Sequence, residues 1–144
     1  MYKNAFFILL ITFAVIATMV VFNGSQGKSE VVVQTDGNKV VEIPVSNNPN
    51  QSKGGIDITV EKIEQLKEST VITLGLNNHS VDLGQDTIYE SSTLNGEPSI
   101  SHEFLSNAVG GHHVEVKVAY EKATSGALEI VASEQASFSF TDIW

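Results

Sequence analysis

The sequence predicts an all-β protein, an antiparallel immunoglobulin-like β-sandwich preceded by one N-terminal transmembrane helix. Three observations support this prediction. A continuous apolar run lies close to the amino terminus. Short segments of alternating apolar and polar residues follow one another from residue 30 onward, at the close spacing typical of sandwiches. The sequence contains no heptad pattern, long amphipathic helix or internal repeat that would favour another class of fold.

The apolar run extends from Ala5 to Phe22 and contains no charged side chain. As a helix it would reach about 27 Å, close to the hydrocarbon thickness of a bilayer, and it exceeds the usual apolar core of a cleaved signal peptide. It therefore favours a single-pass anchor in the cell membrane. Lys3 and the amino terminus favour the cytoplasmic side, which places the following domain outside the cytoplasm. A cleaved leader, and hence a secreted protein, stays open as the alternative.

We expect three parts along the chain. Residues 1–27 form the membrane anchor or uncleaved signal. Residues 28–55 form a β-hairpin, turning at the dipeptide Asp36-Gly37, and then a polar linker rich in Asn, Ser and Gly. Residues 56–144 form the β-sandwich domain.

Period-two alternation supplies the strands of the sandwich. It predicts strands within the segments 56–66, 69–78, 112–122, 127–133 and 136–144. Residues 87–99 begin like a strand and contain a turn at Asn95-Gly96. Residues 101–108 lack clear alternation, and Ser101 resembles a helix cap, so a short helical turn is expected there.

Composition excludes several classes of function. The chain carries a formal net charge of −9 and no basic stripe, so nucleic acid is not an expected partner. The absence of cysteine excludes disulfide scaffolds, thiolate zinc sites and iron–sulfur clusters. The expected partners are therefore the membrane, through the anchor, and another protein of the cell envelope.

Four polar residues beside predicted strands form the candidate site. His79 and Asp82 lie in a loop just after one strand, and His112 and His113 lie just before a later one. Strand ends at one pole of a sandwich converge in space. Imidazole with carboxylate, and without thiolate, suits a divalent metal, and we expect copper(II) or zinc.

Strand geometry limits how the adjacent histidines can act together. Successive side chains point to opposite faces, so His112 is expected to face inward and His113 outward. Both could bind one ion only if the glycines at 110 and 111 distort the backbone. A site of His79, Asp82 and one histidine of the pair is the simpler arrangement. His102 is expected at the surface.

Two motifs carry a resemblance to a known group of proteins. The chain resembles a family of uncharacterised secreted or membrane-anchored β-sandwich proteins of bacteria and archaea, which have a (Thr/Asn)-His-Ser-x-Asp-Leu element and a Gly-His-His element. The likeness extends over about residues 56–144, and Asn78 stands where Thr is common. It implies a shared pole of the sandwich and no particular activity. The matching residues are His79, Ser80, Asp82, Leu83, Gly111, His112 and His113.

Binding is a better hypothesis than catalysis. His79, Ser80 and Asp82 are too close in sequence to form a triad, which needs separate elements converging on one point. His102-Glu103 begins like a zinc-protease motif but lacks the second histidine. We therefore expect no enzyme. One hypothesis is a metal-binding domain, and the other is a structural or interaction module whose edge strands and loops make the contacts and whose histidines brace the fold.

Overall fold

The computed structural model describes residues 31–35, 38–46 and 49–144, with side chains from residue 40 onward. The expected anchor from Ala5 to Phe22 lies outside these residues. Within the described ranges, no helix is long and apolar enough to cross a membrane.

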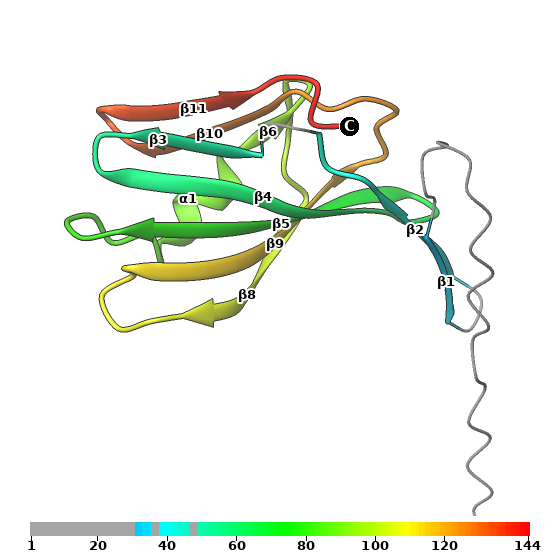
Figure 1. The fold of residues 1–144 in the computed structure, drawn as a ribbon, viewed down its shortest axis with the longest axis horizontal. Coiled ribbons are helices and arrows are strands. Elements are labelled where there is room, and N and C mark those ends of the chain that lie inside the picture. Colours follow the sequence, from blue (N-terminus) through cyan, green and yellow to red (C-terminus); the bar gives the residue numbers. More distant parts are fainter. Residues whose placement is uncertain (1–30, 36–37, 47–48) are drawn as a thin grey trace, which may run out of the picture.

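Two antiparallel sheets make up the described part of the chain (Figure 1). The larger sheet has the strand order β1-β2-β4-β5-β9-β8, and β3 pairs with the amino-terminal half of β4. Its strands are β1 (Val31–Thr35), β2 (Asn38–Ile43), β3 (Asn50–Lys53), β4 (Ile56–Gln65), β5 (Ser69–Asn78), β8 (Ser101–Asn107) and β9 (His113–Glu121).

The smaller sheet has the order β11-β10-β6-β7. It contains β6 (Thr93–Leu94), β7 (Glu97–Pro98), β10 (Leu128–Ser133) and β11 (Ala136–Phe140), and the helix α1 (Asp86–Glu90) precedes it in the chain. The turn between β6 and β7 is Asn95-Gly96, as predicted. Both residues have positive φ, of 54° and 85°, which the two-residue hairpin turn requires.

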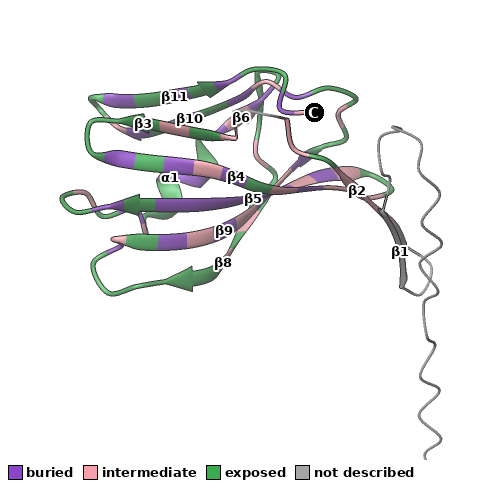
Figure 2. Ribbon diagram, in the orientation of Figure 1, coloured by how far each residue is buried: buried purple, intermediate pink, exposed green. Residues whose placement is uncertain are grey.

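The core lies between the inner faces of the two sheets (Figure 2). In β9 and β11, buried and more exposed residues alternate, so each strand buries one side. Leu74 and Val116 of the larger sheet and Ile130 and Phe138 of the smaller one belong to the same apolar cluster. The all-β, sandwich-like prediction is confirmed, whereas its immunoglobulin-like topology stays a prediction.

Two segments differ from expectation. Residues 101–107 form the strand β8 instead of a helical turn, because they pair with β9 from Ser101↔Ala119 to Asn107↔Val114. A β-bulge between Phe104 and Ser106 interrupts the alternation that would have revealed the strand. The polar segment expected as a linker also contains a strand, β3, which pairs with β4.

Candidate functional site

The two motif loops meet at one end of the larger sheet. The N–H of Asn78 donates to the carbonyl of His112 (2.9 Å), and the N–H of Leu83 donates to the carbonyl of Gly111 (3.1 Å). Gly111 is buried and has φ +62°, and a Cβ there would collide with the Asp82 carboxylate and with backbone nitrogens. The structure thus places the two motifs side by side, with close backbone contact between them.

Local hydrogen bonds hold the first loop. The buried Asn78 side chain accepts from the N–H groups of Ser80 and Val81 and donates to the carbonyl of Val81. The Asp82 carboxylate accepts the N–H of Gly84 (2.9 Å), which is an Asx turn. His79 and Asp82 are both exposed. These contacts explain why the loop takes this shape without requiring a bound ligand.

The two adjacent histidines lie in different environments. His113 is exposed, and its Nδ1 lies 2.6 Å from Oδ1 of Asn77. It lines a hollow of about 170 Å³ with Glu61 and Glu115. Burial, and then the charge of Glu115, raise the pKa of Glu61 above its ordinary value. His112 is half-buried, and within the described part of the chain its Nδ1 is buried without a hydrogen-bond partner.

A pre-formed metal centre is not evident. Within residues 31–35, 38–46 and 49–144, no three or more histidine, aspartate or glutamate side chains are arranged to hold a metal ion. The candidate residues His79, Asp82, His112 and His113 all belong to the described part. The structure brings their loops together but does not assemble their side chains into such a group.

His102 is less exposed than expected. Its side chain is 13% exposed, and its Nε2 lies 2.9 Å from Oδ1 of Asp86. The ring packs against Tyr89 and Phe104, at centroid distances of 5.5 and 5.4 Å. These contacts fix α1 against the inner side of β8. His102 is therefore a packing residue of the fold in this structure.

The edge of β8 is a feature that sequence reasoning missed. No strand of the described residues pairs with the side of β8 opposite β9. The N–H of Ile100 donates to the carbonyl of Ala119 and that of Ala108 to the carbonyl of His113. The odd-numbered residues of β9, including Lys117 and Ala119, therefore turn their backbone groups toward β8, where they face Glu103 and Ser101. By the same alternation, the backbone N–H and C=O groups of His102 and Phe104 point away from β9, toward the open side.

Apolar side chains accompany this open edge. Four large apolar residues are exposed in the part of the chain whose burial is known, and three of them lie on β8 or beside it. These are Ile100 (56% exposed), Leu105 (45%) and Val109 (99%), and the fourth is Val131 on β10. Their concentration within ten residues was visible in the sequence, but the expectation of a helical turn concealed its meaning.

Another long edge of the molecule is covered. Side chains of β3 reach the open side of β11, where Gln51 Nε2 donates to the carbonyl of Ser139 (2.6 Å) and Lys53 Nζ to that of Ser137 (3.3 Å). Lysine is a common protection of exposed edges. The strand β8 contains no lysine. The two edges are therefore treated differently, and β8 is left available for pairing.

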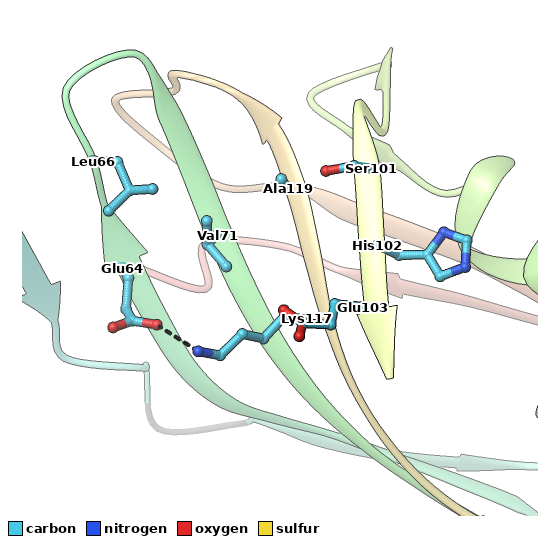
Figure 3. A pocket seen from close by; sticks show the side chains of 8 residues that line it. All are labelled: Glu64, Leu66, Val71, Ser101, His102, Glu103, Lys117 and Ala119. Atoms are coloured by element: carbon cyan, nitrogen blue, oxygen red, sulfur yellow. Dashed lines mark ion pairs between the residues drawn. The ribbon is translucent and has the colours of Figure 1, made fainter. Parts of the chain in front are cut away.

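A second hollow, of about 300 Å³, adjoins β8 on the outer face of the larger sheet (Figure 3). Ser101 and Glu103 point toward it, whereas His102 points to the other side of the strand. Lys117 bridges to Glu64 across it, with 3.9 Å between Nζ and Oε2. The outer face beside β8 thus combines a recess with charged side chains.

Comparisons with known proteins found no match to a protein-family model, to a curated protein or to a solved structure. The resemblance carried by the two histidine motifs therefore stays a prediction.

Proposed function

We propose that this chain is a binding module, not an enzyme, that captures an extended polypeptide segment along the open edge of β8. The apolar run from Ala5 to Phe22 would hold the module at the outer side of the cell membrane. The observation that carries the proposal is the gathering of Ile100, Leu105 and Val109 along an edge strand whose backbone is unpaired within the described residues.

The physical basis is strand addition. An edge strand presents a row of N–H and C=O groups that only another extended chain can satisfy in register. The backbone bonds supply affinity, and alternate side chains of the added strand supply specificity. Exposed apolar residues at both ends of β8 add a hydrophobic contribution that a solvated edge would lack. Capture of a partner strand is therefore a binding role that suits this surface.

The proposal is tested by selecting binders from a library of random ten-residue peptides displayed to the full chain in detergent micelles. Selected peptides should bind the wild-type chain and lose at least tenfold in affinity for Leu105→Lys, which introduces an edge-protecting lysine. Val131→Lys is the matched control, because Val131 is equally exposed but lies on the interior strand β10.

Hydrogen exchange identifies the mode of binding. The amides of His102 and Phe104 should exchange more slowly when a selected peptide is bound, because their N–H groups face the open edge and become hydrogen-bonded. Peptides that bind Leu105→Lys as well as they bind the wild-type chain, or that leave both amides unprotected, would show that binding occurs elsewhere.

Metal binding is the second candidate function. It is favoured by the buried, unpartnered Nδ1 of His112 in the described structure, close to the loop that carries His79 and Asp82. A chelator-stripped sample should be titrated calorimetrically with copper(II) and zinc. Stoichiometric binding at micromolar affinity or tighter, lost in both His79→Ala and His112→Ala, would support one site shared by the two motif loops. No heat of binding would remove this candidate.

A further inference from the structure

We infer that the segment captured at β8 is basic, with lysine or arginine at alternate positions. This inference rests on the proposed function, since it assigns the chemistry of the strand that β8 would accept. It goes beyond that function because strand addition alone requires only an extended backbone and does not specify charge.

The charges around the open edge are one-sided. No lysine or arginine occurs between Lys67 and Lys117, a stretch that includes all of α1 and β8. Exposed carboxylates lie on both elements: Glu103 on β8, and Asp86 and Glu90 on α1. An added strand would therefore meet negative charge, and the nearest lysine, Lys117, lies on β9, on the other side of β8, where it pairs with Glu64.

Glu103 is free to pair with an incoming cation. It lies opposite Lys117 in the register of β8 and β9, but Lys117 forms its ion pair with Glu64. Within the described part of the chain, Glu103 takes part in no ion pair. The Asp86 carboxylate contacts Nε2 of His102, but the Asp86 side chain remains 69% exposed.

Both faces of an added strand would reach these groups. Neighbouring strands lie about 4.8 Å apart, and alternate side chains point to opposite faces. One set would lie beside Glu103, where the small side chain of Ser101 leaves the 300 Å³ hollow accessible. The other set would lie on the side of α1, which packs against the inner side of β8 through Tyr89. Lysine or arginine at alternate positions occupies one face of the added strand, and long, flexible cationic side chains suit whichever of the two faces that is.

The same charges argue against a second copy of the chain as the occupant. Pairing two β8 edges would bring Glu103 and α1 of one copy close to the same acidic groups of the other, and the whole chain carries a net charge of −9. Like charges across an interface are unfavourable. A basic partner is complementary, and its association should be accelerated by the long-range field.

The test compares two synthetic peptides of equal length, Thr-Lys-Val-Lys-Val-Lys-Val-Thr and the same peptide with Gln in place of each Lys. Affinity for the full chain in detergent micelles is measured at low and high salt. The Lys peptide should bind about tenfold more tightly at low salt, since exposed ion pairs each contribute a factor of about two to five. High salt should reduce this ratio.

Matched variants separate a local contact from the overall charge. Glu103→Gln should lower the ratio of the two affinities about threefold, whereas Glu129→Gln, which changes the net charge equally but lies on β10, should leave it unchanged. Equal loss in both variants, or equal affinity for both peptides, would overturn the inference. If library-selected peptides bind at β8 but are not basic, strand capture stands and this inference falls. If no peptide binds, both fall.

Discussion

Replacing Asn78 with alanine tests the reasoning about the loop that joins the two motifs. Its side chain makes three hydrogen bonds, accepting from the N–H groups of Ser80 and Val81 and donating to the carbonyl of Val81. Asn78 is 2% exposed, so the groups that it satisfies partly lack access to water. The substitution removes all three bonds and leaves the strand residue itself in place.

The expected loss follows from which partners can be rehydrated. Ser80 is exposed, so water replaces its lost bond at little net cost. Val81 is half-buried, and leaving its N–H and C=O unsatisfied costs about 1 kcal/mol each. The small cavity left by the amide adds to this cost. Asn78→Ala should therefore lower the free energy of unfolding by about 2–3 kcal/mol.

Asn78→Thr should lower the free energy of unfolding by only about 1–2 kcal/mol, because the hydroxyl oxygen of threonine can still accept a hydrogen bond from one of the two N–H groups.

Urea unfolding followed by the fluorescence of Trp144 measures these differences. Trp144 is the single tryptophan of the chain and packs against the core. Asn77→Ala is the matched control: Asn77 is adjacent but exposed, and water can replace its side-chain contact with His113, so the loss of stability should stay below about 0.5 kcal/mol. A loss in Asn78→Ala no larger than that in Asn77→Ala would refute the assignment of the Asn78 side chain as the anchor of this loop.

Three further outcomes are expected in the same assay. Gly111→Ala should destabilise by more than 2 kcal/mol, since its Cβ meets backbone atoms, whereas Gly110→Ala meets only the His112 ring and should cost about 1 kcal/mol. Burial raises the pKa of Tyr120 to about 12, so the neutral phenol contributes fully to the free energy of unfolding below pH 10, and this contribution is lost as the pH rises toward 12. Tyr120→Phe should therefore lose less stability than the wild-type chain over that interval. Parallel curves of unfolding free energy against pH would contradict this. Because the pKa of Glu61 is raised, its protonated carboxyl contributes fully to stability below pH 4.5, and this contribution is lost at higher pH. Glu61→Gln should therefore gain stability relative to the wild-type chain between pH 4 and pH 7. A difference in unfolding free energy that stays constant over this interval would argue against it.

Much of the fold was predictable because burial on one face imposes a period of two. The segments that contain β4, β5, β9, β10 and β11 were all identified in this way, and the Asn95-Gly96 turn was recognised from its residues. The hairpin of β1 and β2 was also predicted, and in the structure Thr35 lies opposite Asn38. The turn residues 36 and 37 lie outside the described part of the chain.

The strands β3 and β8 were the part of the larger sheet that could not be predicted. In β8, only His102 and Phe104 face the core side, and the bulge after Phe104 removes the alternation. In β3, polar side chains are exposed because the strand adds to the edge of β4 without covering the core. Both strands exist because a neighbouring strand offers hydrogen bonds, which local pattern does not reveal.

The candidate site was predictable as a place but not as an arrangement of side chains. The positions of strand ends indicated that the two motif loops would meet, and backbone hydrogen bonds join them. The orientations of His79, Asp82 and His112 depend on the loop conformation and on the glycine at 111, whose positive φ no alternation rule supplies.

The central position of β5 has a consequence for how the chain folds. Its partner β4 precedes it across a short turn, but its other partner, β9, lies beyond residues 79–112. Closing that long connection is entropically costly, so the β4–β5 hairpin should form first and the docking of β9 should limit the folding rate. Until β9 arrives, β5 presents an apolar, unpaired edge. Newly made chains are therefore most prone to aggregate in this interval, and changes that slow the closure of the 79–112 connection should lower the yield of folded protein.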